Sequence, residues 1–440
     1  MITATVLLLP TGVYSQNPDE WIVYNTTNSG LPHNEVLDVR FDTQGNMWIG
    51  TRGGGIAKFD RNTMWTVYNT ANSGLPSNTA GVFAFDVQEN IWIGTWGGGL
   101  AKFDGDNAWI VYNTTNSGLP HNNVNEIKFD IQANMWIGTQ GGGLAKFDGD
   151  TTWTVYNTAN SGLPYNGVTA INFDAQGNIW IGTGVFWDDG GNGLAKYDGN
   201  TTWTVYNTAN SRLPSNRVYD MAFDAQGNLW IANPEGGLVK FDGDTTWNVY
   251  NPDNSELPSD RVSSIAIDDA QGNIWIGTWF GGMAKFDGDT NWKIYNTTNS
   301  GLPNENINSL AIDTQGNKWI STHGGGLAVY REGGVKVVVE EDFGGMVPSA
   351  FSLSQNYPNP FNPQTMIEYQ LPQTCHIRLV VYNLLGQEIV TLLDQSQQAG
   401  QFNAVWDGKD SYGRVVPSGV YLYKMEAEGF TETKKMLLLE

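Results

Sequence analysis

Short segments of five to seven mostly apolar residues recur along the chain, separated by turn-forming stretches. In the copy that follows Trp109, such segments occupy residues 124–130, 135–139, 144–148 and 153–157, and each predicts a strand. Apolar side chains stand on both faces of these segments, as in sheets that are packed on both sides. Asp-Gly and Gly-Asn pairs between the segments favour tight hairpins, because they tolerate positive φ.

This group of four strands is repeated seven times. A leading tryptophan marks each copy at spacings of 44, 44, 44, 50, 44 and 45: Trp21, Trp65, Trp109, Trp153, Trp203, Trp247 and Trp292. A second tryptophan recurs at Trp48, Trp92, Trp136, Trp180, Trp230, Trp275 and Trp319. A period in the forties with turns between short strands is typical of propeller blades. We therefore predict an all-β chain with a seven-bladed β-propeller over residues 17–331, in which these tryptophans are scaffold.

The two ends of the repeat region predict how the ring closes. The chain enters at a fourth-strand segment, 21–25, and leaves after a third-strand segment, 326–330. Pairing these segments completes the last blade and hides two strand edges that would otherwise be open.

A different pattern follows the repeats. Residues 332–349 have no repeat features and are expected to form a linker with one strand at 335–339. From 350 to 440, alternating runs and tight turns predict a small Ig-like β-sandwich. Residues 1–16 carry an apolar run and then small and polar residues, which indicate a signal peptide or its remnant.

Bulk composition excludes several kinds of partner and site. Asp plus Glu (45) outnumber Lys plus Arg (23), and the net charge of −22 disfavours nucleic acid and anionic membranes as partners. Cys375, the single cysteine, excludes an intramolecular disulfide and a cysteine-based zinc cage. The N-terminal apolar run is too short to span a bilayer, and no other segment is a candidate, so we expect no transmembrane anchor.

The repeat itself carries a family resemblance. Its pattern, LPxNxVxxIxFDxQGNxWIGTxGGGLAKFD, resembles the two-component-regulator propeller repeat in all seven copies. That family occurs in the periplasmic sensor halves of bacterial signalling proteins and in secreted proteins. No histidine-kinase or response-regulator segment follows here, so only the propeller part of the family is carried over.

The C-terminal segment carries a second resemblance. The motifs NYPNPFNP (356–363), VYNLLGQEI, WDGKDSYG, SGVYLYKM and KKMLLL resemble the sorting domain of type IX secretion cargo, an Ig-like module related to flagellar hook-capping domains. The resemblance implies that residues 350–440 engage the type IX secretion machinery of a Gram-negative bacterium. The protein is then expected to be secreted or held on the outer cell surface. An Ig-like domain without a targeting role is the alternative.

Catalytic motifs are scarce. The four histidines, His33, His121, His323 and His376, lack metal-ligand spacing, and no nucleophile elbow or phosphate loop occurs. The Asp-Gly-Asp turns, such as 148–150, offer two oxygen ligands where calcium needs six to eight, and hairpin chemistry explains them better. Streptogramin lyases resemble the chain in blade number, but they need a His with a nearby acid and a magnesium ion. His323 is the only histidine in the loop that follows the second strand of a blade, and no blade of the sequence supplies a His-plus-Glu pair. We therefore predict no enzyme, cofactor or metal.

Candidate binding residues are those at which the copies differ. The position after the Gly-Thr pair, the neighbouring replaced loop and the insertion at 184–192 supply Arg52, Trp96, Gln140, Phe186, Trp187, Asp188, Asp189, Glu235, Trp279, Phe280 and His323. These loops lie at one end of the blades, so the residues are expected to converge around the axis as a platform for a glycan or a peptide. The alternative is drift at exposed loop tips. The predicted function is non-catalytic binding; a structural or adhesive module and a streptogramin-lyase-like enzyme are the alternatives.

Overall fold

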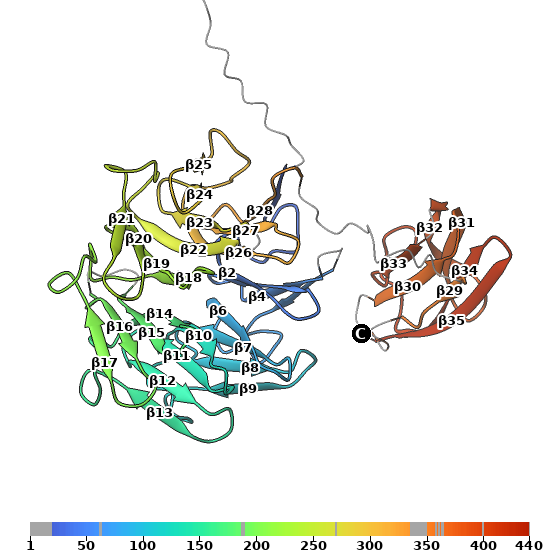
Figure 1. Ribbon diagram of the computed structural model, residues 1–440. Helices are drawn as coiled ribbons and strands as arrows, with labels where there is room; N and C mark the ends of the chain where they lie inside the picture. The colour runs from blue at the N-terminus through green and yellow to red at the C-terminus, as the bar shows by residue number, and fades with distance from the viewer. Residues whose placement is uncertain are drawn as a thin grey trace, which may run out of the picture. The chain divides into compact units, whose positions relative to one another are not determined.

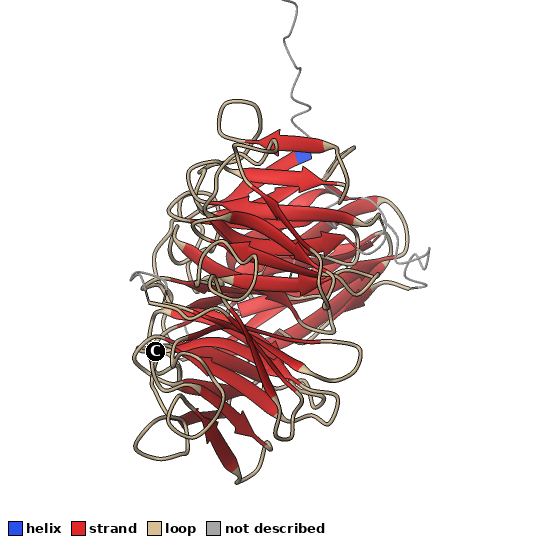
Figure 2. Ribbon diagram, turned by 60° about the vertical axis from the view of Figure 1, so that its left-hand side comes forward, coloured by secondary structure: helices blue, strands red, loops and turns tan. Residues whose placement is uncertain are grey.

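The computed structural model describes residues 20–60, 64–185, 190–268, 271–334, 350–356, 359, 361, 365–397 and 400–439. The chain divides into two compact units, Met1–Val339 and Glu340–Glu440. Apart from a single helical turn residue at Glu20, all described regular structure is β-strand (Figure 2). No helix in this part of the chain is long and apolar enough to cross a membrane. The predicted signal peptide (1–16) and the predicted strand at 335–339 lie outside the described residues.

The first unit contains seven four-stranded antiparallel sheets arranged around an axis (Figure 1). Their strands, from the inner to the outer edge, are as follows: blade 1, β2 (Val36–Phe41), β3 (Met47–Thr51), β4 (Ile56–Phe59) and β5 (Trp65–Tyr68); blade 2, β6 (Ala80–Phe85), β7 (Ile91–Thr95), β8 (Leu100–Phe103) and β9 (Trp109–Tyr112); blade 3, β10 (Val124–Phe129), β11 (Met135–Thr139), β12 (Leu144–Phe147) and β13 (Trp153–Tyr156); blade 4, β14 (Val168–Phe173), β15 (Ile179–Thr183), β16 (Leu194–Tyr197) and β17 (Trp203–Tyr206); blade 5, β18 (Asp220–Phe223), β19 (Leu229–Asn233), β20 (Gly237–Phe241) and β21 (Trp247–Tyr250); blade 6, β22 (Val262–Asp268), β23 (Asn273–Thr278), β24 (Met283–Phe286) and β25 (Trp292–Tyr295); blade 7, β26 (Ile307–Ile312), β27 (Lys318–Thr322), β28 (Leu327–Tyr330) and β1 (Trp21–Tyr24). The first strands of neighbouring blades contact one another around the ring, which places them on the axis. The predicted seven-bladed propeller is confirmed.

The ring closes as the sequence predicts. Strand β1 pairs antiparallel with β28, from Trp21 opposite Tyr330 to Tyr24 opposite Leu327. The Trp21 ring also lies 4.7 Å from the ring of Tyr330, centroid to centroid. The first segment of the repeat region is therefore the fourth strand of the last blade.

The second tryptophan of every copy is a core residue. These seven side chains are at most 2% exposed, and each packs into the neighbouring blade: Trp92, for example, joins Met135, Ile137 and Phe147 of blade 3 in one cluster. The leading tryptophans are only half-buried, with the exception of Trp247 at 9% exposure. The expectation that both sets of tryptophans are scaffold thus holds more strongly for the second tryptophan of each copy than for the leading one.

A short loop after each Gly-Thr pair fixes the position that follows it. In blade 3, Thr139 Oγ1 donates to the carbonyl oxygen of Gly143 (2.8 Å) and accepts from the amide of Gly142 (3.1 Å). Gly143 has a φ of 93°, and a Cβ there would lie 2.2 Å from the carbonyl oxygen of Tyr156, so glycine is needed. The Gly143 amide also donates to Asn166, which ties this loop to the loop that enters blade 4.

The second unit is a β-sandwich. One sheet contains β29 (Ser352–Leu353), β30 (Thr365–Leu371) and β33 (Gly400–Trp406), and the other contains β32 (Glu388–Gln397), β31 (Cys375–Tyr382), β34 (Gly419–Ala427) and β35 (Phe430–Leu438). Their facing side chains, including Ile367, Tyr369, Leu379, Trp406 and Tyr423, form one core. The predicted all-β class is confirmed for both units.

Candidate functional site: an axial cavity

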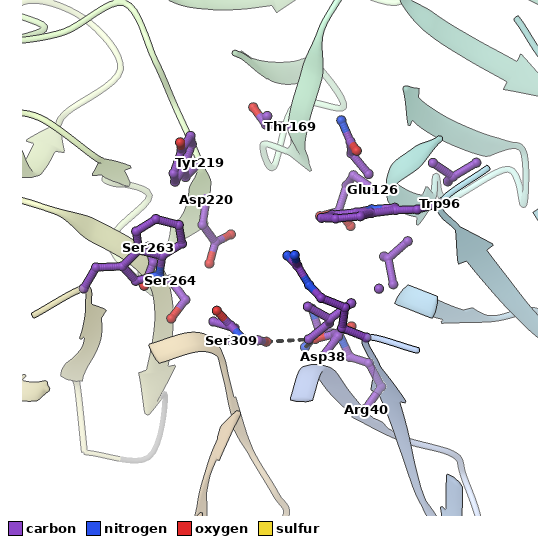
Figure 3. A pocket seen from close by; sticks show the side chains of 18 residues that line it. Asp38, Arg40, Trp96, Glu126, Thr169, Tyr219, Asp220, Ser263, Ser264 and Ser309 are labelled. Atoms are coloured by element: carbon purple, nitrogen blue, oxygen red, sulfur yellow. Dashed lines mark hydrogen bonds and ion pairs between the residues drawn. The ribbon is translucent and has the colours of Figure 1, made fainter. Parts of the chain in front are cut away.

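A cavity of about 130 Å³ lies where the first strands of all seven blades converge (Figure 3). Each blade contributes residues from the start of its innermost strand, and loops of blades 1, 2 and 6 add Arg52, Trp96 and Trp279. The volume is well below the roughly 300–1,000 Å³ of pockets that enclose drug-sized ligands. The cavity is therefore sized for one small polar group or one sugar ring. We call it the axial cavity.

A β-bulge at the start of the inner strands explains why polar side chains reach the axis. The register between the first two strands slips between Val36 and Asp38 in blade 1 and between Val124 and Glu126 in blade 3, and equivalent slips occur in blades 2, 4, 6 and 7. A bulge places two residues opposite one and re-aims their side chains. Successive residues such as Asn125 and Glu126 consequently both line the cavity.

Three carboxylates from alternate blades line the axial cavity: Asp38, Glu126 and Asp220 (Figure 3). Asp38 Oδ1 lies 2.8 Å from Arg40 Nη1 and accepts a 2.8 Å hydrogen bond from the Ser309 hydroxyl. Each of these contacts removes part of the cost of burying the Asp38 charge.

The other two carboxylates are held differently. Glu126 lies 4.0 Å from the ammonium of Lys128, and Asp220 accepts 2.8 Å hydrogen bonds from the backbone amides of Met221 and Ile265. Burial raises the pKa of Glu126 from 4.5 to about 7, although Lys128 and Arg40 oppose the shift. Burial likewise raises the pKa values of Asp38 and Asp220.

Some buried polar atoms of the cavity residues are unpaired. Within the described part of the chain, Asp38 Oδ2, Asn125 Oδ1 and Ser264 Oγ have no hydrogen-bond partner. Asp38 is 3% exposed and Ser264 is 4% exposed. Buried polar groups are nearly always paired in folded proteins, so three unpaired atoms around one cavity indicate a place where a ligand or water supplies the partners.

The mouth of the cavity combines a cation with two indoles. Arg52 Nε lies 2.6 Å from Glu35 Oε1, and the Arg52 guanidinium carbon lies 5.1 Å from the centroid of the Trp96 ring. Trp279 donates from Nε1 to the carbonyl oxygen of Ile307 (3.1 Å). These contacts fix the planes of all three side chains before a ligand arrives.

Four further candidates lie outside the axial cavity. Gln140 is hydrogen-bonded to Asn123, and Glu235 pairs with Arg217 and accepts a 2.9 Å bond from Ser215. Phe280 is 63% exposed at a φ of 70°, and Arg261 lies 5.4 Å from its ring centroid.

His323 is the fourth of these candidates, and it forms a pair that the sequence did not reveal. Its Nδ1 lies 3.0 Å from Glu35 Oε1, the same oxygen that Arg52 approaches. The closure of the ring brings these two residues together from opposite ends of the propeller sequence.

Of the eleven predicted binding residues, the structure brings Arg52, Trp96 and Trp279 into the axial cavity. Four others, Phe186, Trp187, Asp188 and Asp189, lie outside the described residues. The cavity interior was missed, although a signal existed. At one repeated position, two residues after the apolar residue that begins each inner segment of the sequence, the copies carry Asp38, Val82, Glu126, Ala170, Asp220, Ser264 or Ser309. The signal was that three of these seven residues are acidic.

The Asp-Gly-Asp turns are organised by hydrogen bonds of their own. Asp148 Oδ1 accepts backbone hydrogen bonds from Asp150, Thr151 and Thr152 at 2.9–3.0 Å, so its turn is organised by the carboxylate itself. Among the residues that the structure describes, no group of three or more His, Cys, Asp or Glu side chains is placed to hold a metal.

Family models match both units of the chain. Residues 30–53, 162–184, 212–235 and 256–280 match the two component regulator propeller repeat, and residues 362–429 match the FlgD Ig-like domain. A search of curated proteins gave no match.

Solved structures show the same fold at low sequence identity. The extracellular domain of a putative hybrid two component system from B. thetaiotaomicron has a TM-score of 0.62 at 20% identity, and PorZ, a surface component of the type-IX secretion system of Porphyromonas gingivalis, has 0.59 at 17%. These matches cover 96% and 95% of the chain but only 58% and 61% of the two proteins. A streptogramin B lyase has a TM-score of 0.57 at 14% identity, with 71% and 98% covered. The chain thus combines a seven-bladed propeller, in which four segments match the two component regulator propeller repeat, with an Ig-like C-terminal unit.

Proposed function

We propose that the protein is a non-catalytic binding module whose axial cavity and mouth take an extracellular ligand, with a glycan favoured over a peptide. The observation that carries the proposal is the cavity lined by three buried, unpaired polar atoms beneath two fixed indoles. Aromatic faces stack on the apolar faces of sugars, and a few fixed polar groups give orientation. A purely structural module has no need for such unpaired atoms.

Similar proteins support an extracellular role. The solved structures include the extracellular domain of a sensor and a bacterial surface component. We propose that residues 1–16 are a signal peptide or its remnant, that 17–331 form the propeller, and that 332–349 are a linker. The protein is then secreted or displayed on the outer surface of a Gram-negative bacterium.

The Ig-like unit is proposed to direct this export. Residues 350–440 carry motifs that resemble those of a sorting domain. The partner proposed for this unit is the type IX secretion machinery. Deletion from Ala350 onward should leave the propeller in the periplasm, measured by cell fractionation. Unchanged export of the truncated chain would refute the sorting role.

A glycan array with the full chain tests the binding role. Wild-type protein should bind, and Trp96→Ala combined with Trp279→Ala should weaken binding at least tenfold, because the stacking faces are lost. Val87→Ala is the control, since Val87 is 78% exposed in a turn at the opposite end of a blade. Phe280→Ala separates the axial cavity from a wide loop platform: it should leave affinity unchanged if the cavity is the site.

The same array addresses the structural or adhesive alternative. Absence of binding to glycans and short peptides by the wild type, or full binding by the double tryptophan variant, would favour that alternative.

A lyase remains a second candidate because His323 and Glu35 form a His–acid pair. Against it, Glu35 also holds Arg52, and His323 does not line the axial cavity. Magnesium-dependent turnover of a streptogramin B that is lost in His323→Ala would establish the enzyme.

A further inference from the structure

The unpaired atoms of the axial cavity are acceptors of hydrogen bonds. Asn125 has committed its amide nitrogen to the carbonyl oxygen of Val168 (3.1 Å), which leaves Oδ1 as its free atom. Asp38 has committed Oδ1 to Arg40 and Ser309, which leaves Oδ2. The hydroxyl of Ser264 can accept or donate. A ligand that pairs with these three residues must therefore supply hydrogen-bond donors.

Most charged groups of the cavity already have a partner. Asp38 pairs with Arg40, Glu126 faces Lys128, and Arg52 is held by Glu35. Asp220 accepts hydrogen bonds from two backbone amides. A carboxylate on the ligand would place its lone pairs against the free acceptors and its charge beside Asp220. That charge would be buried without a partner, which is costly.

Size and shape narrow the ligand further. The cavity volume is about 130 Å³, and the mouth presents Trp96 and Trp279 with their planes fixed. A single ring with several hydroxyl groups would fill the cavity with donors while its apolar face contacts an indole.

From these observations we infer that the axial cavity takes an uncharged, hydroxyl-rich end of the ligand, one neutral sugar ring, and rejects ends that carry a carboxylate. The inference rests on the proposed binding function and specifies its ligand class. The selecting residues are Asp38, Asn125 and Ser264.

The first test is an array in which each oligosaccharide is printed with two non-reducing ends: a neutral sugar and the corresponding uronic acid. The full chain is expected to bind neutral ends at least tenfold more tightly than the acidic ends. Equal or tighter binding of the acidic ends would overturn the inference and leave the binding function standing. Absence of binding to any glycan would instead overturn the glycan-binding proposal, and the inference with it.

Two serines give a matched pair of variants for the second test. The hydroxyls of Ser264 and Ser321 are both buried and unpaired, but only Ser264 lines the axial cavity. Ser264→Ala should weaken binding of the best neutral glycan about tenfold, the loss of roughly one hydrogen bond to the ligand. Ser321→Ala should change affinity less than twofold.

Asp38→Asn adds a second probe of the cavity residues, because the amide replaces a free acceptor with a donor. It should weaken neutral glycans and reduce the discrimination against uronic acids. If the variant fails to fold, Ser264→Ala alone decides. Equal affinity losses in Ser321→Ala and Ser264→Ala, or no loss in Ser264→Ala, would overturn the role of these cavity residues.

Discussion

The indole Nε1 of Trp48 donates a hydrogen bond to Oδ2 of Asp42 over 3.0 Å. The same contact, between a buried tryptophan and the aspartate six residues before it, occurs in six of the seven blades within the described residues. Asp42 also accepts from the backbone amides of Gln44 and Asn46. One carboxylate thus shapes the hairpin and satisfies the only polar atom of a core side chain.

Removing that carboxylate should destabilise the propeller. In blade 3, Asp130→Ala leaves the buried indole of Trp136 without a partner, at a cost of roughly 1–3 kcal/mol. We expect the melting temperature of the full chain to fall by several degrees, and Asp130→Asn to lower it less because an acceptor remains. Asp150→Ala, in an exposed turn, is the control and should have little effect. Equal melting temperatures for Asp130→Ala and wild type would contradict the role of the contact.

The hydroxyl of the Gly-Thr pair should matter in a similar way. Thr139→Val keeps the shape of the side chain but loses the bonds to Gly142 and Gly143, so we expect a loss of about 1–2 kcal/mol. Differential scanning calorimetry measures the effect. Thr154→Val, at an exposed strand position of the same blade, is the matched control, and valine suits a strand at least as well as threonine. A larger loss for Thr154→Val than for Thr139→Val would refute the prediction.

Stability should also depend on the protonation of Glu126. Its pKa is about 7 in the folded protein against 4.5 for the ordinary group, because burial favours the neutral form. A raised pKa contributes stability that is fully present below pH 4.5 and is lost as the pH rises through 7. The free energy of unfolding should therefore fall by at most about 3 kcal/mol between pH 4.5 and pH 8.

Glu126→Gln tests this dependence, because the amide is neutral at every pH. The difference in melting temperature between the variant and the wild type should be small at pH 5 and should favour the variant at pH 8. Glu256→Gln, at an exposed position, should show no such trend. A difference that stays constant from pH 5 to pH 8 would exclude the raised pKa.

The repeat predicts the ring because each copy carries its own turn and core residues. The spacing of the tryptophans sets the number of blades, and the unequal ends of the repeat region predict the pairing of segment 21–25 with segment 326–330, which the structure shows with Trp21 opposite Tyr330. Both follow from local sequence, since a blade is one chain segment folded on itself.

The cavity interior was not predicted, although one repeated position of the inner segments carried acidic residues in three copies. An alternating strand would turn residues such as Asn125 and Glu126 to opposite faces, but the bulge brings both to the axis, and no residue pattern marked that bulge. The pair of Glu35 and His323 was missed for another reason: it joins residues nearly 300 positions apart that meet only when the ring closes. Variation between copies did point to Trp96 and Trp279, which line the axial cavity. Loop residues that do not build the blade differ from copy to copy, so they are recognisable in a repeat.

Closure itself gives the last prediction. A chain that begins at Thr26 lacks β1, so the edge of β28 from Leu327 to Tyr330 loses its partner and the Tyr330 ring loses Trp21. Exposed strand edges associate with other chains, and we expect a lower melting temperature together with concentration-dependent association in light scattering. A synthetic peptide of residues 17–25 added in excess should restore the monomer, because it binds only the closed ring and stabilises it by mass action. Trp109→Ala, which removes an equivalent ring inside the propeller but leaves both edges paired, should lower the melting temperature without association. A monomeric truncated chain that melts with the wild type would show that the ring holds without its first strand.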